Sequence, residues 1–134
     1  MKKEVTEFTN NNRFSNILKA LILAYIFTFA LIFIYSIVLA YTNISDSTIP
    51  MVVTGITIFS IFLSTVIYCG KMATAGLING TIISGMYLAI VYILGSAFGV
   101  GYALNQQSLI IIISVLLIGA IGGIIGVNFN KLQR

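Results

Sequence analysis

Histidine and tryptophan are absent from this chain, and cysteine and proline occur once each, as Cys69 and Pro50. Charge is scarce as well, because seven basic and three acidic residues make up only 7% of the 134 positions. Soluble domains carry about 25% charged residues, which cover their water-facing surface. The composition therefore excludes a soluble enzyme and a disordered chain, and the single cysteine excludes a scaffold of disulfides within the chain.

The same absences limit the chemistry. A metal site needs clustered His, Cys, Asp or Glu side chains, and the three acids, Glu4, Glu7 and Asp46, are scattered. A serine nucleophile needs a general base. With no histidine in the chain, the one imaginable arrangement is Ser64 as the nucleophile with Lys71 as its base. Coupled transporters of protons or cations usually hold a carboxylate or a histidine inside the membrane. We therefore predict no enzyme activity, no cofactor, no metal and no nucleic-acid partner.

Apolar sequence is abundant, and 59% of the residues are hydrophobic. The hydrocarbon core of a bilayer is about 30 Å thick, and a helix needs about 20 apolar residues to cross it. Helices are expected rather than strands, because a segment in lipid must satisfy its own backbone hydrogen bonds. The long uncharged runs supply four such helices, at about 20–41, 49–68, 75–98 and 108–127.

The predicted fold is an all-α bundle of four transmembrane helices that occupies residues 17–128. A cluster of glycine and polar residues between Gly99 and Ser108 marks the loop that separates the last two helices. A short polar tail (1–16) precedes the bundle, and a basic tail (129–134) follows it.

The basic residues indicate how the helices lie across the bilayer. With four spans, both termini and the turn near residue 70 share one side, which holds all seven Lys and Arg residues. Lysine and arginine near span ends are retained on the cytoplasmic side. We therefore predict that both termini are cytoplasmic and that the lipid bilayer is the chain's first partner. The residues expected to set this topology are Lys19, Lys71, Lys131 and Arg134.

Small residues recur at helical spacing along the third and fourth predicted helices. Helices in lipid associate through close packing of such residues, so we expect these faces to turn inward. The predicted packing residues are Gly76, Gly80, Ser84 and Gly95 on the third helix, and Gly119, Gly122 and Gly126 on the fourth. If the bundle packs with a further protein, Gly85 and Gly123 are expected to face outward.

A second set of candidate site residues is polar. Thr57, Ser60 and Ser64 share one sector of the second helix, and Asn79 lies about one turn into the third. Such side chains either hydrogen-bond between helices or line a polar path through the membrane. Asn79, the most polar side chain in a span, is expected to join two helices or to contact a ligand. On the first helix, one sector holds Tyr25, Thr28, Tyr35 and Ser36.

Several segments carry a resemblance to a known family. They are Ile17-Leu18-Lys19, Ile49-Pro50, the glycine-containing stretches 76–80 and 85–87, and above all the stretch 119–128. With these features in order, the chain resembles the uncharacterised YrzE-like proteins, small four-helix membrane proteins of bacilli and clostridia, over residues 17–131. The basic turn before the third helix is sparser here, with Lys71 alone. The resemblance implies a multi-pass protein of the bacterial cytoplasmic (inner) membrane, and it implies no activity.

Three functions remain open at this point. The first is a non-enzymatic membrane protein that packs with itself, as a homo-oligomer, or with a larger membrane partner. The second is a small channel or uncoupled transporter with a path lined by Ser, Thr and Asn side chains. The third is a pore-forming protein of the holin type, which the small size and the basic ends suggest.

Overall fold

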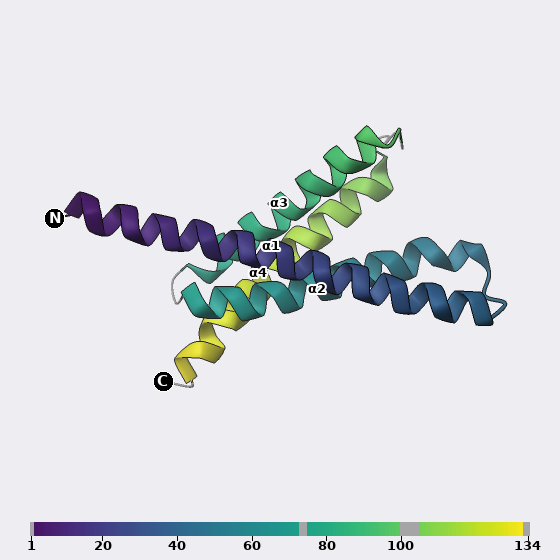
Figure 1. Cartoon of the computed structure of the whole chain (residues 1–134), viewed down its shortest axis with the longest axis horizontal. Coiled ribbons are helices and arrows are strands. Elements are labelled where there is room, and N and C mark those ends of the chain that lie inside the picture. Colours follow the sequence, from purple (N-terminus) through teal and green to yellow (C-terminus); the bar gives the residue numbers. More distant parts are fainter. Residues whose placement is uncertain (1, 73–74, 100–104, 133–134) are drawn as a thin grey trace.

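The chain folds into four long helices, and no strand occurs within the residues that the computed structural model describes, which are 2–72, 75–99 and 105–132. Each helix contains a stretch long and apolar enough to cross a membrane. The all-α fold with four membrane-spanning helices is therefore confirmed, and it indicates a multi-pass membrane protein. The helices are α1 (Lys2–Tyr41), α2 (Ile49–Met72), α3 (Gly76–Ala97) and α4 (Gln106–Leu132), with a short 3-10 turn, η1 (Asp46–Thr48), before α2 (Figure 1).

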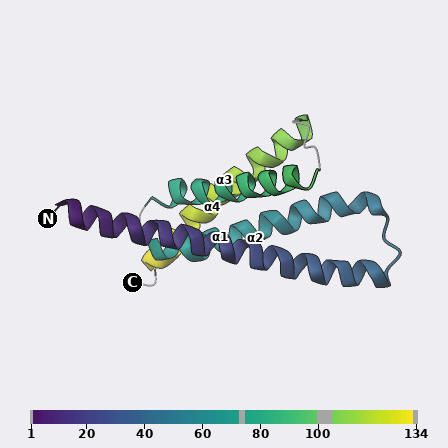
Figure 2. The same ribbon diagram turned by 45° about the horizontal axis from the view of Figure 1, so that its top comes forward.

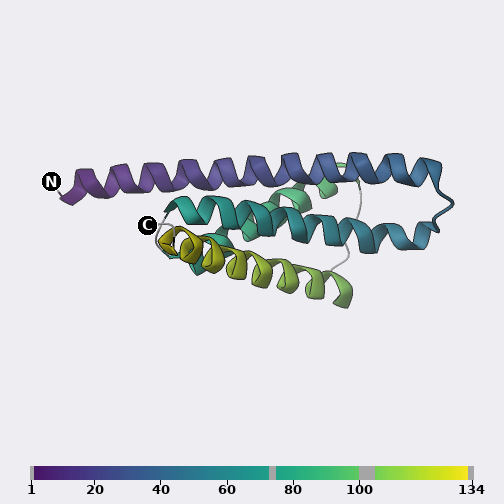
Figure 3. The same ribbon diagram turned by 90° about the horizontal axis from the view of Figure 1, so that it is seen from below.

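The first helix is much longer than the apolar run that predicted it. The sequence placed its start near residue 20, after a tail, whereas α1 begins at Lys2 and contains 40 residues. At a rise of about 1.5 Å per residue, a helix of this length extends about 60 Å. Proline and glycine, which interrupt helices, are absent from the first 41 residues. The amino-terminal part of α1 therefore continues the membrane span Arg13–Tyr41 and projects beyond the other helices (Figure 3).

Backbone conformation limits α3 at both ends. Ala75, which precedes the helix, has a left-handed conformation with φ of 50°. Gly99, which follows it, has φ of 75°, and its N–H donates to the Ser96 carbonyl at 3.2 Å. Glycine takes this conformation without strain because it has no Cβ, so Gly99 is a favourable residue to end the helix.

The four helices form two hairpins, α1–α2 and α3–α4, that lie together at one end and diverge toward the other (Figures 1 and 2). We call the two ends of the molecule the terminal end, which holds the start of α1 and the end of α4, and the loop end, where α1 stops and α4 starts. Helix α4 packs against both α2 and α3, whereas α1 packs on α2 and only lightly on α3. The fold is therefore a V-shaped pair of hairpins.

Candidate functional site

Glycines bring α3 and α4 into backbone contact in the half of the molecule near the terminal end. At Gly76 and Gly80 of α3, an added Cβ would come closer than 3.0 Å to the backbone of Gly123 and Gly119 of α4, respectively. At Gly119, an added Cβ would come equally close to the Ser84 side chain. Residues without a large side chain at these positions let the two backbones approach.

A neighbouring face of α4 packs on α2. An added Cβ at Gly122 would collide with the Thr65 hydroxyl, and one at Gly126 with the backbone of Val66. The glycines of α4 thus serve two partners, α3 and α2, although the sequence placed Gly119, Gly122 and Gly126 in one stripe. All of them fall within a sector of about 100° at 3.6 residues per turn, which is wide enough to face two helices.

The structure corrects the expectation that Gly85 and Gly123 face outward. Gly123 is enclosed between Gly76 and Gly80 of α3. Gly85 lines the cavity described below, where an added Cβ would meet only a Leu116 methyl group at 3.8 Å. A smooth outer groove of glycines is therefore not formed by these two residues.

The four polar residues predicted to line a path or to join helices, Thr57, Ser60, Ser64 and Asn79, do not line a common cavity. Ser60, Ser64 and Asn79 are fully buried. The Ser60 hydroxyl donates to a carbonyl of its own helix, and the Ser64 hydroxyl donates across to the Ala20 carbonyl of α1. Only Thr57 lines the cavity. Ser64 and Asn79 thus act between helices in this structure, and these four side chains form no continuous path within the described part of the chain.

Asn79 is held by Arg13, a residue of the segment that the sequence predicts to be a polar tail. The Nε and Nη2 atoms of Arg13 donate to the Asn79 side-chain oxygen at 2.9 and 2.7 Å. Asn79 is fully buried, and Arg13 is half-buried. The signal was present in the sequence, because no helix breaker separates Arg13 from the apolar run that begins after Lys19. A continuous helix carries this cation to the edge of the bundle, where it reaches α3.

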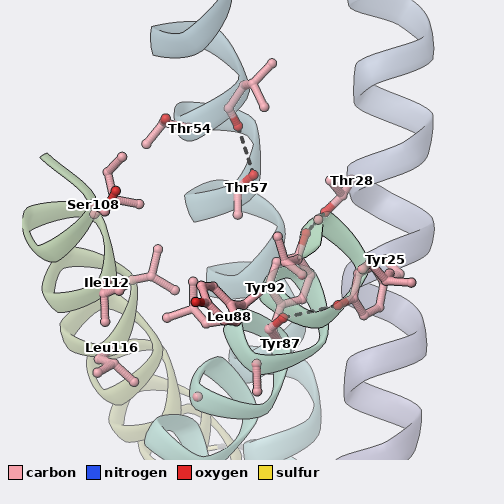
Figure 4. A pocket seen from close by; sticks show the side chains of 18 of the residues that line it. Tyr25, Thr28, Thr54, Thr57, Tyr87, Leu88, Tyr92, Ser108, Ile112 and Leu116 are labelled. Atoms are coloured by element: carbon pink, nitrogen blue, oxygen red, sulfur yellow. Dashed lines mark hydrogen bonds between the residues drawn. The ribbon is translucent and has the colours of Figure 1, made fainter. Parts of the chain in front are cut away.

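The diverging halves of the hairpins border a half-open cavity of about 780 Å³, lined by all four helices (Figure 4). Its walls are mostly apolar and aromatic, and no charged side chain is among the lining residues. Gly95, which was predicted to pack helices, also lines this cavity. The cavity lies where α4 carries large side chains (109–113) in place of the glycines at 119–126, so the helices stand further apart there. Prominent wall residues are Phe29, Ile32, Val53, Leu88, Tyr92, Ile112 and Leu116.

Four hydroxyl-bearing residues on the cavity wall form what we call the hydroxyl cluster: Tyr25, Thr28, Thr57 and Tyr87 (Figure 4). The rings of Tyr25 and Tyr87 are stacked, with centroids 4.5 Å apart and planes at 18°. The Thr28 and Tyr87 hydroxyl oxygens are 3.0 Å apart, and Thr57 of α2 lines the same cavity. This cluster, together with Arg13–Asn79, joins α1 to α3.

The predicted topology residues lie at the terminal half of the molecule where they are described. The side chains of Lys19 and Lys71 are exposed, and the Lys71 ammonium lies 4.9 Å from the centre of the Tyr68 ring. Of Lys131 only the backbone is described, in the last turn of α4, and Arg134 lies outside the described residues. Cys69 is buried without a disulfide.

The sequence matches a family described as a protein of unknown function (DUF3792) over residues 13–126. The chain belongs to this family. The DUF3792 match begins at Arg13, so the residue that holds Asn79 falls inside the family region, as do all four residues of the hydroxyl cluster. No curated protein matches the chain, and no solved structure matches it.

Proposed function

We propose that this DUF3792 protein is a non-enzymatic membrane protein that works by receiving a second membrane component between its two hairpins. The cavity of about 780 Å³ carries this proposal, because it is lined by all four helices and has apolar walls. A second copy of the chain, a larger membrane protein and a membrane-dissolved molecule are the components that the sequence and the cavity suggest. The loop-end half of the molecule is where we expect them to bind.

A small channel is less well supported. A path for ions or polar solutes needs polar groups exposed along its length, whereas Ser60, Ser64 and Asn79 are fully buried. The cavity walls beside Thr57 are largely apolar. Flux of ions or small solutes through purified protein in liposomes would reverse this preference.

The membrane and the orientation are also proposals. We infer that both termini face the cytoplasm of a bacterial inner membrane, as the distribution of basic residues predicts, and that the chain is one of the YrzE-like proteins of bacilli and clostridia. The exposed Lys19 and Lys71 side chains in the terminal half support this orientation. In it, the cavity opens in the outer half of the bilayer.

Site-specific photo-crosslinking in native membranes tests the proposed function. A photoreactive amino acid replaces Ile112, which lines the cavity, or Ile121, a half-exposed residue on the packed half of the same helix. We expect position 112 to form a discrete adduct with a second component, whereas position 121 forms only adducts with bulk lipid. Identical adducts at the two positions would show that nothing is selected by the cavity.

A further inference from the structure

The size of the cavity restricts what can fill it. Small-molecule sites have volumes of about 300–1,000 Å³ and mostly apolar walls with a few placed polar groups. The cavity, with about 780 Å³ and mostly apolar walls, has both properties. It therefore has the size and the lining of a site for a small molecule.

The charge of the walls restricts the occupant further. None of the lining side chains is charged, so a carboxylate, a phosphate or an ammonium group would be buried here without a counter-ion. Burial of an unpaired charge is strongly unfavourable. The part of the occupant inside the cavity is therefore neutral, and most of its surface is hydrocarbon against walls such as Phe29, Leu88 and Leu116.

The hydroxyl cluster decides which polar group the occupant carries, because its protons are already donated to the protein. The Thr28 hydroxyl donates to the Ala24 carbonyl at 2.8 Å. Its only proton is thereby used, so in the 3.0 Å contact with Thr28 the Tyr87 phenol is the donor.

The other two members have donated their protons as well. The Tyr25 phenol donates to the Tyr87 carbonyl at 3.2 Å, and the Thr57 hydroxyl donates to the Val53 carbonyl at 2.9 Å. A hydroxyl oxygen has two lone pairs in addition to its proton. These four hydroxyls therefore offer acceptors to the cavity, and a ligand that only accepts could bind this cluster only by breaking an existing hydrogen bond.

The geometry points to a neutral long-chain alcohol as the occupant: a membrane-dissolved molecule with a hydrocarbon body and one hydroxyl group that donates to the hydroxyl cluster. An amide also has an N–H donor, but its carbonyl oxygen would find no free donor in the hydroxyl cluster, which costs free energy in a buried site. An ester or an ether has no donor at all. This inference rests on the proposed function and names the chemical class of the component that the hairpins receive.

The test compares matched probes on the purified full-length chain in phosphatidylcholine nanodiscs. The probes are a 16-carbon primary alcohol with a photoreactive diazirine in mid-chain, its methyl ether and the corresponding carboxylate. Mass spectrometry locates the labelled residues. We expect the alcohol to label cavity residues about two- to tenfold more than the ether, the ratio that one net hydrogen bond supplies, and unlabelled 1-hexadecanol to compete. The carboxylate is expected to label only the outer surface.

A double variant separates recognition from simple cavity filling. Thr28→Val with Thr57→Val keeps the shape of both side chains, removes two acceptors and leaves the Tyr87 phenol free to donate. The alcohol-to-ether ratio is expected to fall to one or below, while total labelling of the cavity by the ether is kept or increased. Thr81→Val is the control, because the Thr81 hydroxyl donates to the Leu77 carbonyl and does not line the cavity. That variant should keep the wild-type ratio.

The outcomes distinguish the two proposals. Equal labelling of the cavity by alcohol and ether, or an unchanged ratio in the double variant, overturns the alcohol while leaving a cavity that receives a membrane component. Absence of all probes from the cavity, together with a crosslink from position 112 to a second copy or another protein, also overturns the alcohol and keeps the proposed function. Absence of both probes and crosslinks removes both proposals.

Discussion

Substitution of Gly126 by alanine tests whether glycine contacts hold the packed half of the molecule. An added Cβ at this position would collide with the Val66 carbonyl oxygen and lie 3.0 Å from its carbonyl carbon and its Cα. Ordinary contacts of a Cβ begin at 3.4 Å. Because the opposing atoms belong to the backbone of α2, no side-chain rotation can relieve the collision, and the two helices must move apart.

The expected cost follows from overpacking of a close contact. Forcing an additional methyl group into a packed interface typically costs about 1–3 kcal/mol. A change of that size corresponds to a shift of roughly 5- to 150-fold in the equilibrium between closed and open forms. Alanine also favours the helical conformation over glycine by up to about 1 kcal/mol, so the measured effect is the difference between these two contributions.

The single cysteine supplies the assay. Cys69 lies one turn beyond Val66 on α2 and is fully buried, so a membrane-permeant maleimide modifies its thiol only when the helices open. After the helix preference of alanine is subtracted, we expect Gly126→Ala to accelerate this modification by up to about 30-fold. A melting curve in detergent, followed by circular dichroism, checks that the overall stability falls in the same direction.

Gly55→Ala is the matched control. Gly55 belongs to α2 as well, yet an added Cβ there would meet no atom within 4 Å. Its replacement should leave the modification rate unchanged or lower it through the helix preference of alanine. If Cys69 is modified at the same rate in Gly126→Ala and in Gly55→Ala, close backbone contact does not stabilise the α2–α4 interface, and our account of the packing is wrong.

Three further predictions concern the polar contacts and the topology. Arg13→Gln and Asn79→Leu should each lower the free energy of unfolding by roughly 1–3 kcal/mol. The double variant should lose less than the sum of the two single losses, and a loss equal to that sum would show that the two side chains do not act together. Ser64→Ala removes the hydrogen bond to a carbonyl of α1 and should cost about 1 kcal/mol, measured as faster thiol modification, whereas an unchanged rate would argue against that bond. A phosphatase fused at Asp46 should be active and one fused at Lys71 inactive, and the reverse pattern would invert the topology.

Much of the fold could be predicted from the sequence, because lipid leaves few choices. Uncharged runs of about 20 residues have to become helices, and small residues at helical spacing mark where helices can approach. The pairing of Gly76 with Gly123 and of Gly126 with Val66 could not be predicted in the same way. The spacing of small residues shows which face of a helix can pack closely, but it does not show which other helix that face contacts.

The cavity could not be predicted from the sequence either, for a related reason. Tyr25 and Thr28 stood out as a polar sector of the first helix, yet their contact with Tyr87 depends on how α1 crosses α3. The role of Arg13 was missed because α1 was expected to start near residue 20, which left this residue in a tail. Helix continuity, rather than residue type, places Arg13 against Asn79.

The V shape of the two hairpins has a consequence for the surrounding lipids. The hairpins lie together at one end and spread at the other (Figures 1 and 2), so in the proposed orientation the protein has a larger cross-section in the leaflet at the loop end. It therefore displaces more lipid from the leaflet around the spread end than from the opposite one. Membrane regions whose leaflets already differ in area accommodate such a tapered body with the least distortion.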